Sequence, residues 1–188
     1  ATEYFADNAP KFLKEEFIQT ESYMSYIRFD PLGIVFGIMP WNFPFWQVWR
    51  CAIPALCAGN VFLLKHSTNV PGCAQMIHEI FNQALPKGIF TTLLIDVKTA
   101  NQIIEENLID AVSLTGSVEA GKQIAQVSGK NLKKTVLELG GSDPFIILED
   151  ANLQLACETA IQARTINSGQ SCIAAKRFII VERKFNEV

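Results

Sequence analysis

The chain is 188 residues long, 49% hydrophobic, and carries a formal net charge of −3. This length and composition suit one domain or slightly more, with a substantial buried core. The acidic balance provides no basic surface for nucleic acid or for an acidic membrane. No apolar run approaches the ~20 residues that a membrane-spanning helix needs. We therefore expect neither nucleic acid nor a membrane as a partner.

Five cysteines occur at positions 51, 57, 73, 157 and 172, with irregular spacing and no C-x-x-C pair. This pattern favours neither a zinc site nor a disulfide framework, so no metal ligands are predicted. The first residues carry no signal-peptide pattern. Reduced thiols without such a signal predict a cytoplasmic protein.

Hydrophobic periodicity predicts the elements in chain order. Residues 4–17 have a helical pattern, and 22–29 alternate loosely like an exposed strand. Strands are then expected at 33–38, 61–64, 90–95, 111–114 and 135–139, with helices at 45–58, 71–84, 97–107 and 117–128. Strands that alternate with helices of this length predict an α/β fold, a Rossmann-like parallel sheet with helices on both faces.

A second pattern starts after the two glycines at 140–141, where the backbone turns easily. It comprises a strand at 145–148, a helix at 152–165 and a strand at 178–182. We therefore divide the chain into regions 1–32, 33–140 and 141–188. A first residue other than Met, and a sheet that has only begun where the chain stops, predict a fragment of a longer protein.

Polar residues gather at the predicted carboxyl ends of the strands, where parallel α/β sheets bind ligands. Each has a plain structural explanation when taken singly. Asn42 satisfies the backbone of a Pro-rich turn, Ser117 caps a helix, and Glu138 is a surface acid. The general polarity of loops does not explain well why all of these residues fall at the same edge of the predicted sheet. Free N–H groups after Gly116 and Ser117 also suit a phosphate.

The end of strand 61–64 indicates which ligand the rim suits. No G-x-G-x-x-G follows the first strand, so the standard dinucleotide fingerprint is absent. In nucleotide-binding sheets, an Asp or Glu near this strand end hydrogen-bonds the ribose 2′-hydroxyl of NAD, whereas a cationic side chain accommodates the 2′-phosphate of NADP. Here Lys65 precedes His66, Ser67 and Thr68 without a carboxylate, which favours NADP. The alternative is that Lys65 is a solvated lysine at a strand end.

Cys172 ends the small polar turn NSGQSC at 167–172. A thiolate is the most nucleophilic side chain near neutral pH, and such a turn lets a carbonyl approach the sulfur. Glu138, if held partly away from water, suits a general base, and the Asn42 carboxamide suits an oxyanion. The alternative for any single cysteine is simple packing. Neither His66 nor His78 is predicted to be catalytic, and His78 is expected to be exposed on its helix.

Four motifs in this order resemble the aldehyde dehydrogenase superfamily. They are PWNFP at 40–44, LTGS at 114–117, ELGG at 138–141 and GQSC at 169–172. The resemblance covers about residues 27–181. The run LLKHSTNVP at 63–71 most resembles the succinate-semialdehyde dehydrogenase branch, whose members often use NADP.

The resemblance implies that region 33–140 binds NADP, or NAD as the second choice, and that 141–188 begins a catalytic domain. It also implies that Cys172 attacks an aldehyde, with succinate semialdehyde as the candidate substrate. The Asn42 side chain and the Cys172 N–H hold the oxyanion, hydride passes to the nicotinamide, and Glu138 activates the water that releases the acid. The positions that match cofactor contacts are Trp41, Asn42, Lys65, His66, Ser67, Thr68, Gly116, Ser117 and Leu139.

The family also has segments that this chain lacks, including a Glu-x-Phe-Gly-Pro segment and a strand used in subunit contacts. The chain alone is therefore expected to be inactive, and the intact parent to be a homo-oligomer. One alternative is a CoA-acylating aldehyde dehydrogenase, against which Glu138 argues because that reaction needs no hydrolytic base. Another is a noncatalytic nucleotide-binding fragment. A cysteine hydrolase is the weakest, because neither histidine lies in a partner motif.

Overall fold

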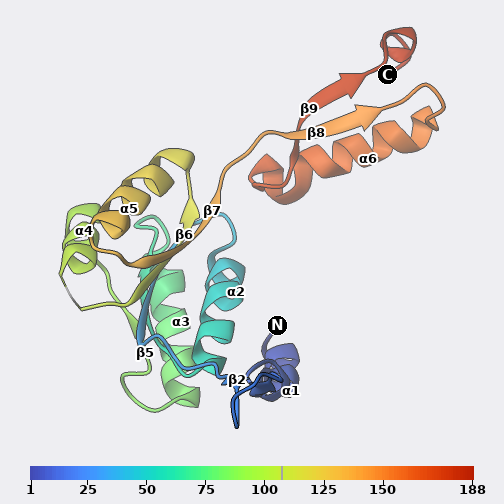
Figure 1. Ribbon diagram of the computed structural model, residues 1–188. Coiled ribbons are helices and arrows are strands. Elements are labelled where there is room, and N and C mark those ends of the chain that lie inside the picture. Colours follow the sequence, from blue (N-terminus) through green and yellow to red (C-terminus); the bar gives the residue numbers. More distant parts are fainter. Residues whose placement is uncertain (107) are drawn as a thin grey trace. The chain divides into compact units, whose positions relative to one another are not determined.

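A computed structural model describes residues 1–106 and 108–188 (Figure 1). The chain forms two compact units, Ala1–Glu138 and Leu139–Val188, and each is described by itself. The roles predicted for regions 1–32, 33–140 and 141–188 remain predictions. Within the described residues, none of the helices has the length and apolar character that a membrane span requires.

A five-stranded sheet with the order β5-β4-β3-β6-β7 organises the first unit. Its strands are β3 (Ile34–Met39), β4 (Val61–His66), β5 (Phe90–Thr92), β6 (Ala111–Gly116) and β7 (Lys134–Leu139). The pairs β3–β4, β3–β6 and β4–β5 are parallel. The predicted Rossmann-like α/β fold is thereby confirmed.

Helices cover both faces of this sheet (Figure 1). One face packs against α2 (Pro44–Cys57) and α3 (Pro71–Ala84), and the other against α4 (Val97–Glu105) and α5 (Val118–Lys130). Neighbouring residues of β3 explain the division: Val35 belongs to the first cluster and Phe36 to the second. Successive strand side chains point to opposite faces, so an uninterrupted apolar strand supplies two cores.

The helices begin and end close to the predicted positions. A proline in the first turn starts both α2 and α3, where its missing N–H has no helical partner to lose. The Asp96 side chain accepts from the Thr99 N–H and caps α4. The predicted helix at 97–107 ends at Glu105, and its last predicted position, 107, lies outside the described residues.

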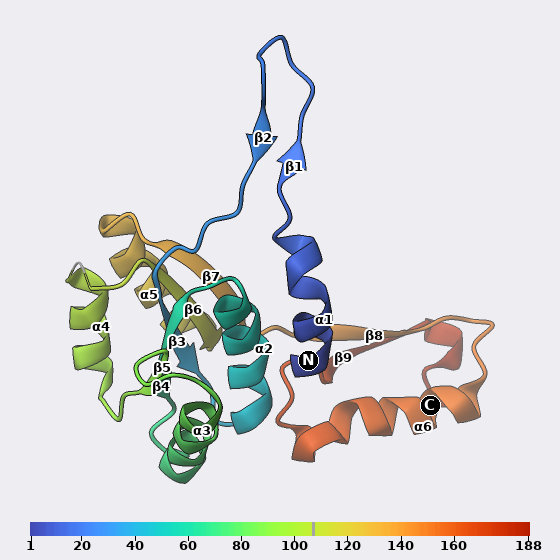
Figure 2. The ribbon, with the colours of Figure 1, turned by 90° about the horizontal axis from the view of Figure 1, so that it is seen from below.

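The N-terminal region differs from its prediction. Helix α1 (Thr2–Phe12) stops earlier than residue 17, and β1 (Glu16–Phe17) pairs antiparallel with β2 (Tyr26–Ile27). Figure 2 shows this hairpin beyond the end of α1. The rings of Phe17 and Tyr26 lie 5.9 Å apart across the two strands. This cross-strand contact stabilises the pairing where the periodicity favoured a longer helix.

The second unit contains a parallel pair of strands and one helix. Its elements are β8 (Asp143–Ile147), α6 (Leu153–Thr165), the turn η1 (Ile166–Gly169), β9 (Ala175–Ile180) and the short η2 (Glu182–Lys184). The Asn152 side chain caps α6 by accepting from the Leu155 N–H. Strand β9 starts three residues earlier than predicted because Ala175 pairs with Asp143 at the beginning of β8.

Candidate functional site

The predicted cofactor residues of the first unit lie at one edge of its sheet. Asn42 follows β3, Lys65 and His66 end β4, and Gly116 ends β6. Both β4 and β6 run parallel to β3, so the carboxyl ends of the three strands share an edge. This edge, formed by residues 40–43, 65–68 and 116–117, is called the rim below.

Lys65 is buried rather than solvated, with only 7% of its surface exposed. Its ammonium lies 3.4 Å from the His66 carbonyl oxygen, to which it donates. The side chain lines a cavity of about 70 Å³ that α4 and α5 also border. Burial lowers the pKa of Lys65. The interpretation of Lys65 as a solvated lysine at a strand end is therefore wrong.

The same cavity contains an acceptor that lacks a partner within the described part of the chain. It is the carboxamide oxygen of Asn101, on α4. A buried polar atom without a hydrogen bond is unfavourable by roughly 1–3 kcal/mol. A ligand that brings both an anion for Lys65 and a donor for Asn101 would remove both penalties. These two groups fit a phosphorylated, polar cofactor such as a nucleotide.

Ser117 caps α5, as its structural explanation predicted. Its hydroxyl oxygen accepts a hydrogen bond of 3.2 Å from the Ala120 N–H. The hydroxyl therefore serves the helix, and the groups suited to a phosphate are the backbone N–H groups of the first turn. Directly after β4, the Ser67 hydroxyl donates to the Asn69 side chain at 2.7 Å.

The two histidines have different surroundings. His66 is 4% exposed, and both its ring nitrogens lie within hydrogen-bonding distance of backbone atoms. His78 was expected to be exposed, which is wrong: it is half-buried, and its Nδ1 lies 3.3 Å from the Thr92 N–H. This burial arises because α3 packs against β5, a contact that helical periodicity does not specify.

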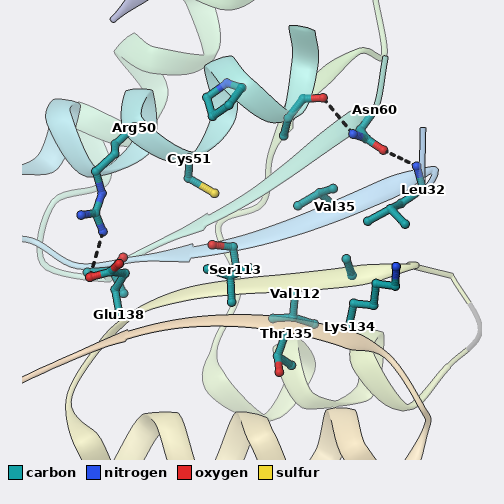
Figure 3. Close-up of a pocket in the computed structure, with 15 residues that line it drawn as sticks. Leu32, Val35, Arg50, Cys51, Asn60, Val112, Ser113, Lys134, Thr135 and Glu138 are labelled. Carbon is teal, nitrogen blue, oxygen red and sulfur yellow. Dashed lines mark hydrogen bonds and ion pairs between the residues drawn. The ribbon is translucent and has the colours of Figure 1, made fainter. Parts of the chain in front are cut away.

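Glu138 lies on β7, in a groove of about 720 Å³ between α2 and strands β6 and β7 (Figure 3). Its Oε2 lies 3.4 Å from Nη2 of Arg50, and its side chain is 56% exposed. The partly dry environment expected for this base is therefore absent from the structure. Strand β7 is the edge strand of the sheet, which leaves its side chains open to solvent. The sequence analysis did not identify Arg50. Its only indication in the sequence is that it lies on the helix that follows Asn42.

Cys51 faces the same groove, beside Ser113 (Figure 3). Burial raises the pKa of the Cys51 thiol. A protonated, buried thiol is a poor nucleophile and packs as a small apolar group. Cys51 is therefore a packing residue, which is the alternative that the sequence left open for any single cysteine.

Cys172 lies in the second unit, after a turn of unusual backbone conformation. Three consecutive residues, Asn167, Ser168 and Gly169, have φ values of 51°, 57° and 76°. This left-handed region is natural for glycine and tolerable for Asn, but it is strained for most other residues. A side chain at Gly169 would also place its Cβ 3.4 Å from the Arg164 carbonyl oxygen. The turn reverses the chain between α6 and the half-buried cysteine.

Lys176, at the start of β9, holds this turn in place. Its ammonium donates to the carbonyl oxygens of Cys172 at 2.6 Å and of Gly141 at 2.8 Å. One residue further, the Arg177 guanidinium donates to the Ser142 carbonyl oxygen at 2.9 Å. Strand β9 thus connects the cysteine turn with the segment that follows β7. The sequence analysis did not identify Lys176. Its only indication in the sequence is that it follows Cys172 by four residues.

The structure brings the rim residues together on three adjacent strands of the first unit. Cys172 and Leu139 belong to the second unit, whereas Asn42 and Glu138 belong to the first. The joint action of Cys172 with Asn42 and Glu138 therefore remains a prediction.

Known proteins match this chain along its whole length. The profile of the aldehyde dehydrogenase family matches residues 1–188. A probable NADP(+) succinate-semialdehyde dehydrogenase of Synechocystis sp. is 54% identical over 178 residues, which cover 94% of this chain and 39% of that protein. An NAD(P)+ succinate semialdehyde dehydrogenase of Escherichia coli is 50% identical over 181 residues, covering 96% and 39%.

Solved structures agree with this match. The succinic semialdehyde dehydrogenase of Streptococcus pyogenes, crystallised with NADP+, has a TM-score of 0.93 at 37% identity, covering 98% of this chain and 41% of that one. A lactaldehyde dehydrogenase has a TM-score of 0.93 at 34% identity, covering 99% and 40%. The chain thus spans about two fifths of these relatives. Because the family profile matches all 188 residues, the chain belongs to the aldehyde dehydrogenase family.

Proposed function

We propose that this chain is the nucleophile-bearing and cofactor-binding part of an NADP-dependent dehydrogenase that oxidises succinate semialdehyde to succinate. The observation that carries the proposal is the Cys172 turn, held by Lys176 in a chain of this family. The relatives of Synechocystis sp. and E. coli, which bear succinate-semialdehyde dehydrogenase names, support the choice of substrate.

The chemistry follows from three side chains. The Cys172 thiolate attacks the aldehyde carbon and forms a C–S bond, and the carbonyl oxygen becomes an oxyanion. The Asn42 carboxamide and the Cys172 N–H donate hydrogen bonds to that oxyanion. When bound, NADP would supply the acceptor for the hydride that leaves this carbon, and Cys172 would then carry the acyl group as a thioester. Glu138 then takes a proton from a water molecule that attacks the thioester, which releases the acid and restores the thiolate.

Glu138 has a partner that bears on this step. Its carboxylate lies in the groove and forms an ion pair with Arg50 there. Because the pair is largely exposed, the guanidinium constrains Glu138 only weakly. Glu138 can therefore leave Arg50 to reach a water molecule at little energetic expense.

Three observations support NADP as the preferred cofactor, with NAD as the alternative. Lys65 is a buried cation at the end of β4, and Ser67 and Thr68 add hydroxyl groups without a carboxylate. A 2′-phosphate suits such a cation. The S. pyogenes relative was crystallised with NADP+. A cytoplasmic, homo-oligomeric enzyme remains the prediction; all five cysteines are free, consistent with reduced thiols.

The direct test removes the sulfur nucleophile. In the intact protein, Cys172→Ala should abolish NADPH formation from succinate semialdehyde, because no covalent intermediate forms, while NADP binding measured by calorimetry stays within about threefold of wild type. Cys51→Ala is the matched control, because this cysteine only packs. Turnover retained in Cys172→Ala would refute the nucleophile assignment, and NADPH formation without release of the acid would refute the hydrolytic step.

A further inference from the structure

His66 is a buried histidine in the 65–68 segment of the rim. It is the last residue of β4 and pairs with Met39, the last residue of β3. From there its ring extends toward the beginning of α2. The residues between, 40–43, form the loop that carries Asn42.

The ring contacts define one tautomer of the imidazole. Nε2 lies 3.0 Å from the Pro44 carbonyl oxygen, and Nδ1 lies 2.9 Å from the Ser67 nitrogen. With its proton on Nε2, His66 donates to Pro44 and accepts from the Ser67 N–H. With its proton on Nδ1, the ring could donate to the Met39 carbonyl oxygen at 3.2 Å, but the Nε2 lone pair would then face the Pro44 oxygen and the Nδ1–H would oppose the Ser67 N–H. The Nε2–H tautomer is therefore the favoured one.

These contacts fasten both ends of the loop at 40–43. Before the loop, the Ser67 N–H is shared between the Met39 carbonyl oxygen and His66 Nδ1, each at 2.9 Å. After it, the Pro44 carbonyl oxygen accepts from His66. No side chain caps α2 at Phe43. The imidazole does not replace that cap, because it donates to a carbonyl oxygen instead of accepting from a first-turn N–H. His66, at the end of β4, and Ser67, directly after it, thus hold the segment that presents Asn42.

Packing alone does not require this arrangement. An apolar side chain of similar size would fill the same space without needing two polar contacts in a buried setting. A buried imidazole is favourable only when its ring nitrogens are paired, as they are here. A hydrogen bond has a preferred distance and angle, so the bond from His66 fixes the position of Pro44 more tightly than an apolar contact would.

We propose that His66 is a positioning residue for the oxyanion donor: its bond to Pro44 fixes the β3–α2 loop in the conformation from which Asn42 donates. This inference rests on the proposed function, because the role of Asn42 is itself proposed. His66 acts through the loop and does not touch the substrate. A displacement of about 1 Å at a reacting group lowers rates by about 100-fold, so loosening the loop should be visible in kcat.

Two substitutions separate the contacts of the ring. His66→Asn keeps a polar atom near Nδ1 that can accept from Ser67, but it cannot reach Pro44. His66→Gln places an amide N–H near Nε2 and can restore the bond to Pro44. Asn42→Ala, alone and combined with His66→Asn, measures how far the effect passes through Asn42. His78→Asn is the control for loss of a half-buried histidine outside the rim.

The test compares kcat with NADP and succinate semialdehyde, and the Kd for NADP, in the intact protein. Asn42→Ala should lower kcat by about 100- to 1,000-fold, the usual effect of losing an oxyanion donor. His66→Asn should lower kcat at least about 10-fold with less than a threefold change in Kd, and His66→Gln should recover most of that loss. In the Asn42→Ala background, His66→Asn should add less than about twofold.

Different outcomes overturn different statements. If Asn42→Ala is impaired but His66→Asn keeps the wild-type kcat, or if the two losses multiply, the positioning role of His66 is wrong. If Asn42→Ala itself turns over like wild type, the proposed oxyanion role fails instead. A nitrogen-15 NMR spectrum of the wild-type histidines needs no variant: a His66 protonated on Nδ1 alone would exclude the bond to Pro44.

Discussion

The surroundings of buried Lys65 indicate the chemistry of a ligand that would suit its cavity. Its ammonium has one long hydrogen bond to a backbone carbonyl and lies in a cavity with the unpaired Asn101 oxygen. Charges are rarely buried without a partner, because losing hydration is unfavourable by several kcal/mol. The Asp96 carboxylate is an opposite charge that acts on this ammonium, and an anionic ligand in the cavity would add a direct partner. Under the proposed function, the burial of Lys65 therefore lowers the stability of the unliganded protein and raises its affinity for NADP.

Lys65→Met should separate these two effects. Removing the ammonium should weaken NADP binding by about 10- to 100-fold, because a charged hydrogen bond contributes about 1.5–3 kcal/mol. NAD binding should change less than about threefold, since NAD lacks the 2′-phosphate. Calorimetric titration of both cofactors measures the difference, with exposed Lys98→Met as the control. Equal losses for NADP and NAD would argue against a 2′-phosphate contact.

At the scale of elements, strand ends and turns carry the candidate chemistry. The β3–α2 loop is fastened by β4, and the cysteine turn is fastened by β9. Both fastenings use side chains that donate to backbone carbonyl oxygens. Such bonds restrain the loop while leaving its own side chains available for a ligand. Rigid elements thus position residues that the loops present.

Lys176→Met tests the second fastening. Without the ammonium, the Cys172 and Gly141 carbonyl oxygens lose a shared charged donor, so the turn should open more often. Hydrogen exchange followed by mass spectrometry should show faster amide exchange in residues 167–174 and unchanged exchange in β3 and β4. Lys184→Met, which removes an exposed ion pair with Glu187, serves as the control. Protection of the turn equal to wild type would contradict the fastening.

At the scale of the whole molecule, the apolar pattern of the sequence predicts some features of the structure and not others. The strands and helices were predictable because buried strands and amphipathic helices differ in their apolar period. The rim was predictable too, since carboxyl ends of parallel strands share an edge. The contact between Arg50 and Glu138 was not, because it depends on β7 lying beside β6 at the sheet edge. The burial of Lys65 and His66 likewise depends on how helices pack, which local pattern does not encode.

Stability of the folded molecule should depend on pH through His66. Burial lowers the pKa of His66, and the nearby Lys65 charge adds to the effect. In the unfolded chain the pKa of histidine is about 6.5, so below that pH the unfolded state binds more protons than the native state. Stability should therefore fall as pH drops from about 6.5 toward the native pKa.

Urea unfolding of wild type and His66→Gln between pH 7.5 and 5 measures this effect. The other titratable groups are common to both proteins, so the difference in slope reports His66. Wild type should lose more of its unfolding free energy on acidification than His66→Gln does. Identical pH dependence would mean that burial of the ring does not perturb its titration.

The register of β3 and β4 has a consequence for changes of sequence. The ladder is unbroken from Ile34 opposite Val61 to Met39 opposite His66, so a one-residue insertion in either strand would turn its side chains to the wrong face. Thr68 lies past the last pair and is exposed. Under the proposed function, a substitution at Thr68 can alter the cofactor site without disturbing the ladder, whereas a change of length within the ladder would disrupt the packing of both faces.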